Sequence, residues 1–90
     1  MPRRMLKWVL DITDTQEVWV PEGANFRHLD EQYGTVVIWG DGDPDRPLEA
    51  RKIVIIGTGR PVPGGGLYLG TVLTSSGTLV WHVYEQASSS

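Results

Sequence analysis

Residues 53–85 read IVIIGTGRPVPGGGLYLGTVLTSSGTLVWHVYE, and this stretch decides the fold. The apolar run 53–56 is typical of a strand, and it ends at a loop rich in glycine and proline over residues 57–66. Residues 67–74 and 78–85 are two further segments with strand chemistry, joined by Ser-Ser-Gly. A three-residue loop that contains glycine is a common hairpin connection. The stretch therefore predicts a strand, a loop and a β-hairpin.

The rest of the chain has the same strand chemistry. Apolar residues alternate with polar or mixed ones over residues 5–12, and a short strand at 17–20 is stopped by Pro21. Residues 24–33 and 36–39 predict a hairpin around Gly34, although the spacing of Phe26 and Leu29 also allows one helical turn. An acidic loop at 41–47 then leads into a strand at 48–56.

About seven short, mostly antiparallel strands therefore predict an all-β fold, a small barrel or sandwich. We expect one domain over residues 1–87 and a disordered tail at 88–90.

The composition narrows the classes of function. The net charge of −3 argues against a non-specific nucleic-acid binder, which needs a basic surface. The absence of cysteine favours a reducing cytosol, and no stretch approaches the roughly 20 apolar residues of a membrane span. A chain of 90 residues buries only roughly 60% of the surface that it exposes when unfolded. We therefore expect a homo-oligomer and no membrane partner.

The loop at 57–66 fails both nucleotide motifs that it suggests. The dinucleotide fingerprint needs a third glycine where Val62 stands, and a helix where strand chemistry follows. The Walker motif needs Lys and Ser or Thr where Gly65 and Gly66 stand. Two interpretations stay open. The backbone of Thr58 and Gly59 could form an anion-binding nest with Arg60 beside it, or the loop simply connects two strands.

No residue pattern predicts catalysis, a metal or a cofactor. Asp41, Asp43 and Asp45 mimic the start of a calcium loop, but Arg46 and Lys52 occupy positions that need glycine and glutamate. There is no nucleophile elbow or zinc motif. His82 should point away from Trp81 on the last strand, where it either lines a groove or is an ordinary, partly buried histidine. We therefore expect a protein that is not an enzyme.

The aromatic side chains are numerous for a small core. The 90 residues include four tryptophans, three tyrosines and one phenylalanine. Trp39 and Trp81 are candidates for stacking on a ring ligand, because tryptophan is enriched at binding sites. The alternative is that these residues fill the core and an oligomer interface.

Several segments together resemble a family of short phage and prophage β proteins that has no established general activity. They are WVLDITDTQ at 8–16, PEGA at 21–24, IGTGRPVP at 56–63, YLGT at 68–71 and GTLVWHVYE at 77–85. Members carry a G-T-G-[HR]-P loop and a closing L-V-[FW]-H strand. This chain departs from the family in its acidic loop at 41–47 and in the additional glycines at 64–66.

The resemblance implies a phage-encoded protein in the cytosol of a bacterial host, with a role in counter-defence. One hypothesis is a non-enzymatic protein that sequesters a small anionic, nucleotide-like signal. Its ligand-binding residues would be Thr58, Gly59, Arg60, Trp39, Trp81 and His82. The alternative hypothesis is a protein–protein interaction module, either an inhibitor of a host defence protein or a minor phage assembly factor.

Overall fold

The computed structural model describes residues 2–12 and 14–86, which form seven strands and no helix. The strands are β1 (Arg4–Leu10), β2 (Thr15–Pro21), β3 (Asn25–Gln32), β4 (Thr35–Gly42), β5 (Leu48–Gly57), β6 (Gly66–Thr74) and β7 (Leu79–Gln86). The described part of the chain accordingly contains no helix that could traverse a lipid bilayer. The expected tail at 88–90 lies outside the described residues.

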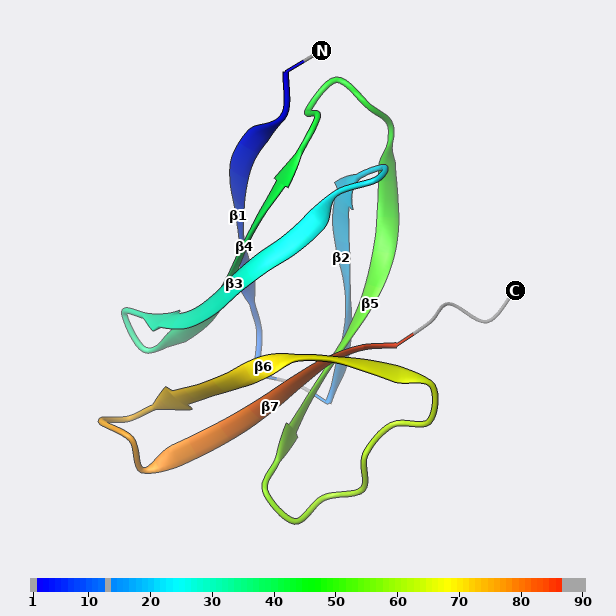
Figure 1. Cartoon of the computed structure of the whole chain (residues 1–90). Helices are drawn as coiled ribbons and strands as arrows, with labels where there is room; N and C mark the ends of the chain where they lie inside the picture. The colour runs from blue at the N-terminus through cyan, green and yellow to red at the C-terminus, as the bar shows by residue number, and fades with distance from the viewer. Residues whose placement is uncertain (1, 13, 87–90) are drawn as a thin grey trace.

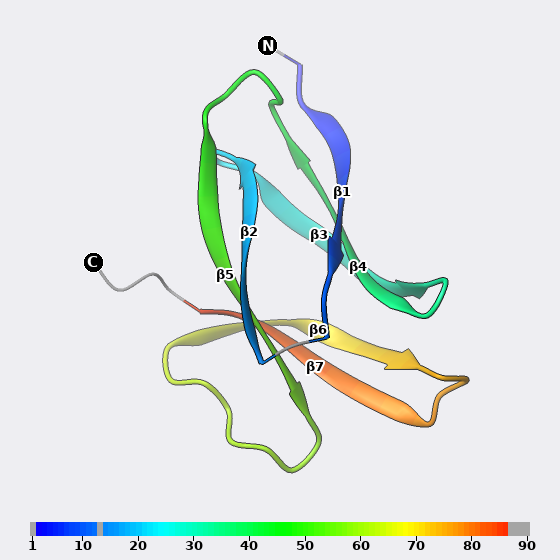
Figure 2. The ribbon, with the colours of Figure 1, turned by 180° about the vertical axis from the view of Figure 1, so that it is seen from behind.

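The strands form two antiparallel sheets that pack as a sandwich. Sheet A has the order β1-β4-β3, and sheet B has the order β2-β5-β7-β6. In Figures 1 and 2, β6 and β7 cross the lower end of the molecule at a steep angle to β2, so sheet B is strongly twisted. The predicted all-β fold is confirmed, and its form is a sandwich.

Alternation along the strands places the core between the two sheets. In sheet A, Ile38 lies opposite Trp8 on one side and Leu29 on the other, all on the inner face. In sheet B, Ile55 lies opposite Val83. The buried side chains of both sheets form one cluster: Leu10, Val18, Val20, Ala24, Val36, Ile38, Ile53, Ile55, Val72 and Val83. The apolar positions of the sequence thus build a single core.

Strand β4 continues further than the sequence predicts. It ends at Gly42, so the expectation that Asp41 begins a loop was wrong. The reason lies at Gly40, where an added Cβ would be 2.3 Å from the carbonyl oxygen of Asn25. Glycine lets β3 approach here, and arginines on neighbouring segments pair with Asp41. Close backbone approach therefore extends the ladder.

The two predicted hairpins are confirmed. Tyr33 and Gly34 join β3 to β4 with φ of 55° and 80°, as a two-residue turn of the primed type requires. The segment at 24–33 is thus a strand rather than a helical turn. Residues 75–78 join β6 to β7, so β7 begins one residue later than predicted; Ser75, Ser76 and Gly77 have positive φ. Tight turns therefore set both registers.

Candidate functional site

A cleft of about 260 Å³ opens where the loop after β5 meets the connection from β1 to β2. Its lining residues are Ile12, Asp14, Ile55, Gly57, Arg60 and Trp81. We refer to it as the Arg60 cleft. The amide N–H of Ile55 donates to the carbonyl oxygen of Asp14 at 3.2 Å, which continues the β2–β5 ladder by one step. Backbone pairing therefore brings Asp14 to the cleft, where Ile12 also lies.

The indole of Trp81 forms a fixed wall of the Arg60 cleft. Trp81 lies opposite Gly57 in the β5–β7 pair, and an added Cβ on Gly57 would be 3.8 Å from the six-membered ring. The indole N–H donates to the hydroxyl of Thr74 at 2.9 Å. Trp81 also packs against the buried core. The ring is therefore held in one orientation by contacts that do not involve a ligand.

The turn over residues 57–60 explains the glycine that follows Thr58. The amide N–H of Arg60 donates to the carbonyl oxygen of Gly57 at 3.2 Å. Gly59 occupies the third position of this turn with φ of +94°. A positive φ at that position favours glycine. The geometry supports the strand-connection interpretation for Gly59, and one N–H of the expected anion nest is already used within the turn.

Arg60 differs from most other arginines of the chain in its electrostatic surroundings. Arg3, Arg27, Arg46 and Arg51 each pair with a carboxylate. The exposed side chain of Arg60 pairs with no residue among 2–12 and 14–86. Asp14 lines the same cleft but does not form an ion pair with Arg60. The Arg60 cleft thus offers one cation and one anion, both available to a ligand.

Thr58 and His82 come together on the other face of sheet B. The hydroxyl of Thr58 lies 2.9 Å from Nε2 of His82, and the hydroxyl of Thr71 lies 3.1 Å from Nδ1. The hydroxyl of Tyr68 bonds to that of Thr71. Trp81 lies inward on β7, so its neighbour His82 lies outward, as the alternation predicts. Both ring nitrogens of His82 therefore have a partner, and this group lies outside the cleft lining.

Trp39 is placed apart from the other predicted site residues. It lies on β4 in sheet A, opposite Lys7 and His28, and its ring centroid is 5.8 Å from that of His28. Its neighbour Ile38 is buried in the core, so Trp39 lies on the outer face. The structure therefore brings Arg60 and Trp81 into one cleft, with Gly59 shaping the turn beside them, and leaves Trp39 outside it.

One protein-family model matches the whole chain, residues 1–90. The chain belongs to the DUF7352 family. The family is described as a domain of unknown function. No curated protein and no solved structure matches the chain. The family description names no ligand or reaction, so the function has to be argued from the geometry of the site.

The sequence did not reveal two residues that line the cleft of the DUF7352 domain. Ile12 belonged to a predicted strand, which in fact ends at Leu10, and Asp14 was not a candidate for any site. Their approach to Trp81 depends on the pairing of β2 with β5, which no local pattern encodes. The hydroxyl of Thr71, which completes the surroundings of His82, depends in the same way on the β6–β7 register.

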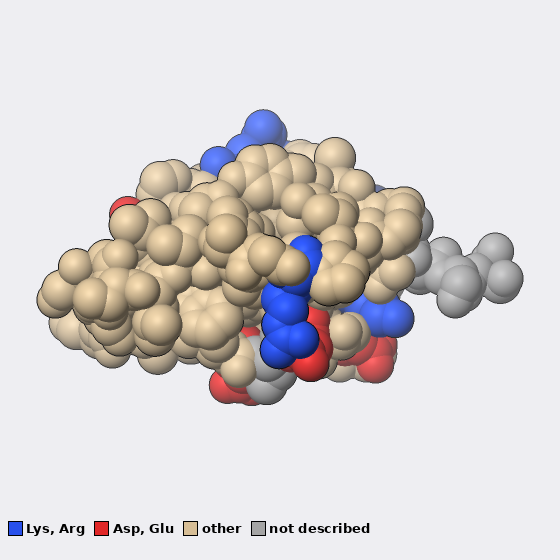
Figure 3. All heavy atoms as spheres, turned by 90° about the horizontal axis from the view of Figure 1, so that it is seen from below, with Lys and Arg blue, Asp and Glu red and all other residues tan. Residues whose placement is uncertain are grey.

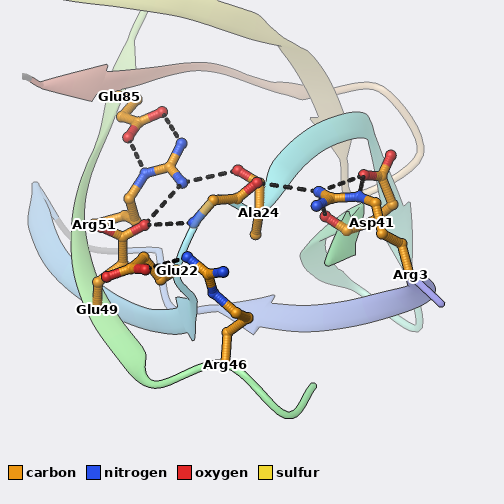
Figure 4. A network of polar contacts seen from close by, with 9 residues as sticks. Arg3, Glu22, Ala24, Asp41, Arg46, Glu49, Arg51 and Glu85 are labelled. Atoms are coloured by element: carbon orange, nitrogen blue, oxygen red, sulfur yellow. Dashed lines mark hydrogen bonds and ion pairs between the residues drawn. The ribbon is translucent and has the colours of Figure 1, made fainter. Parts of the chain in front are cut away.

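The DUF7352 domain has a second, more polar cleft of about 370 Å³ at the opposite end of the sandwich. It is lined by Arg3, Glu22, Gly23, Asp43 and Arg46. Figure 3 shows the molecule from below, where β6 and β7 lie, and charged side chains are sparse on that side. Charged side chains instead gather around the second cleft, in the network of polar contacts drawn in Figure 4.

The arginines of this network are already paired within the domain. Arg46 pairs with Glu22, and Arg3 pairs with Asp41. Hydrogen bonds from Arg27 and from Arg3 lower the pKa of Asp41 to about 2. The hydrogen bonds to Glu85 raise the pKa of Arg51. Since these charges compensate one another, the network is best explained as support for the fold.

Proposed function

We propose that this DUF7352 chain is a non-enzymatic binding protein that holds a small anionic, nucleotide-like molecule in the Arg60 cleft. One observation carries the proposal. Arg60 has no carboxylate partner among the described residues, and it lines the same 260 Å³ cleft as Trp81, whose ring is fixed. Arginine recognises carboxylates and phosphates, and tryptophan stacks on planar rings.

The size and charge of the cleft define the class of ligand. Small-molecule sites usually occupy about 300–1,000 Å³, so a cleft of about 260 Å³ suits one ring and one anionic group. The carboxylate of Asp14 would repel a second anionic group and would accept a hydrogen bond from an amino group. A nucleoside monophosphate with an amino-bearing base, or the equivalent half of a larger signal, fits these requirements.

The expected energies are sufficient for capture. A charge-assisted hydrogen bond contributes about 1.5–3 kcal/mol, and a base stacked on an aromatic ring contributes about 1–3 kcal/mol. Asp14 is the one lining residue with an ordinary acid–base group, and His82 belongs to the opposite face of β7. The cleft therefore suits holding a molecule better than transforming it. The resemblance to phage proteins supports sequestration of a host immune signal as the biological purpose.

Calorimetric titration tests the proposal with a matched pair of variants. The panel contains nucleoside monophosphates, cyclic dinucleotides and isomers of cyclic ADP-ribose. Arg60→Ala should weaken the binding of the recognised compound by about 10- to 150-fold, because it removes the charge-assisted bond. Arg4→Ala is the control, since Arg4 is also exposed and also has no ion-pair partner in the described part of the chain.

The outcomes of the titration separate the non-enzymatic part of the proposal from the assignment of the cleft. Chromatography after incubation should return the bound compound unchanged, and a product would overturn the non-enzymatic part of the proposal. The absence of heat across the panel, or equal losses for the two variants, would overturn the assignment of the cleft. Pull-down of one specific host protein by wild type and by Arg60→Ala alike would then favour the protein-binding alternative.

A further inference from the structure

The outer face of β6 and β7 is unusually poor in charge. Residues 58–84 contain one charged side chain, Arg60, although 21% of the whole chain is charged and 27 average residues would carry about six. Figure 3 shows this lower side of the molecule as a broad area with few Lys, Arg, Asp or Glu side chains. A surface of this kind lacks the charges that usually keep a small protein's surface hydrated and apart from other copies.

The side chains of this face can be assigned from the strand register. Those pointing away from the core are Val54 and Ile56 from β5, Tyr68, Thr71 and Leu73 from β6, and Val80, His82 and Tyr84 from β7. We call this set the β6–β7 face. Tyr68 and Leu73 are 54% and 52% exposed, which is high for large apolar side chains. Tyr68 and Tyr84 contact each other at 5.4 Å between ring centroids.

Four polar side chains on the β6–β7 side of sheet B already pair with one another inside one chain: Thr58, Tyr68, Thr71 and His82. Both ring nitrogens of His82 have hydroxyl partners, Thr58 and Thr71, and the hydroxyl of Tyr68 bonds to Thr71. Covering the face would therefore leave none of these groups without a hydrogen bond. This removes the main penalty for burying polar atoms.

We propose that the β6–β7 face binds the same face of a second copy of this chain. Charge favours this occupant over an unlike protein. Copies with a net charge of −3 repel each other on average. On this face, two copies can meet without bringing like charges close together. A charged partner, in contrast, would find nothing on the face to pair with. The inference does not depend on the function proposed for the Arg60 cleft.

The dimensions of the face suit a small dimer. β6 has 9 residues, so it extends about 30 Å at roughly 3.3 Å per residue. β5, β7 and β6 lie side by side, and with their side chains they span about 15–20 Å. Length times width gives a flat footprint of roughly 450–600 Å². The accessible surface of the protruding side chains is larger than this flat area, so the face approaches the ~800 Å² that each partner buries in a standard interface. An interface of ~800 Å² would cover about a seventh of the 5698 Å² accessible surface of the chain.

Sedimentation equilibrium up to about 1 mM protein tests the proposal. Wild type should form a dimer. Leu73→Arg should raise the dissociation constant by about 100-fold or more, because each interface then buries two unpaired guanidinium groups. Met5→Arg is the matched control, since Met5 is 64% exposed on the outer side of sheet A. It should leave the dimer unchanged.

Leu73→Ser provides a second variant in case the arginine prevents folding, and circular dichroism checks the fold of each. It should weaken the dimer in the same direction but by less. A wild-type monomer at about 1 mM would overturn the proposal, whatever else binds the face. Equal dissociation of the Leu73 and Met5 variants would also overturn it, because the effect would then not belong to the β6–β7 face.

Discussion

Replacing Arg51 with methionine should lower the free energy of unfolding by about 3 kcal/mol. Arg51 lies on the inner face of β5 and forms two hydrogen bonds with the carboxylate of Glu85 on β7. It also donates to the carbonyl oxygen of Ala24 at 3.0 Å, and its guanidinium lies 4.6 Å from the centroid of Phe26 in β3. One side chain therefore ties sheet B to the other half of the sandwich.

The magnitude follows from the exposure of the pair. Removing one partner of a fully buried ion pair costs about 3–5 kcal/mol, because the other charge is left without compensation. The side chains of Arg51 and Glu85 are 20% and 17% exposed, so water reduces that cost to about 2–3 kcal/mol. The contact with Phe26 adds about 0.5–1 kcal/mol. A total near 3 kcal/mol corresponds to a fall in Tm of about 12–24 °C.

Urea denaturation followed by tryptophan fluorescence provides the measurement. Arg46→Met is the control, because the Arg46–Glu22 pair is 55% and 53% exposed and should contribute at most about 1 kcal/mol. The double variant Arg51→Met with Glu85→Met should recover part of the loss, since no uncompensated carboxylate remains. A loss at Arg51 no larger than at Arg46 would show that burial of the Arg51–Glu85 pair does not stabilise the fold.

Three further perturbations test other parts of the structure. Asp41 has a folded pKa of about 2 against 3.8 when unperturbed, so its contribution to stability is complete above pH ~4 and is lost as the pH falls towards 2. The urea midpoint of wild type should therefore drop over that pH range more than the urea midpoint of Asp41→Asn. Gly40→Ala should cost about 3 kcal/mol, because its Cβ would lie 2.3 Å from a carbonyl oxygen, whereas Gly64→Ala, with no atom within 4 Å, should change the urea midpoint little. Thr58→Val should cost about 1 kcal/mol by removing the partner of His82, while calorimetry should find ligand binding in the Arg60 cleft unchanged.

The sequence predicted the strands well because their signals are local. Alternation, glycine at turns and the apolar run at 53–56 each act over a few residues, and all seven strands follow from them. The end of β4 was missed because the close approach at Gly40 depends on a strand pairing. A glycine beside an acidic residue indicates a loop until its neighbour across the sheet is known.

Part of the candidate site could be predicted from local sequence signals, and part depends on how the strands pair. The residue types at Arg60 and Trp81 suggested an anion site next to an aromatic ring, and the register of β5 with β7 places them in one cleft. Period-two alternation separated Trp81 from His82 on opposite faces of one strand. Asp14 and the distance to Trp39 could not be inferred, because both depend on how the two sheets are connected and packed.

The most direct test of the anion-binding cleft is a nuclear magnetic resonance titration of the side-chain N–H groups with adenosine monophosphate. The Nε–H signal of Arg60 and the indole signal of Trp81 should shift together and saturate, while the Nε–H signal of Arg4 should stay in place. Equal shifts of the two arginine signals, or the absence of a saturating shift at both Arg60 and Trp81, would show that the cleft does not bind the anion.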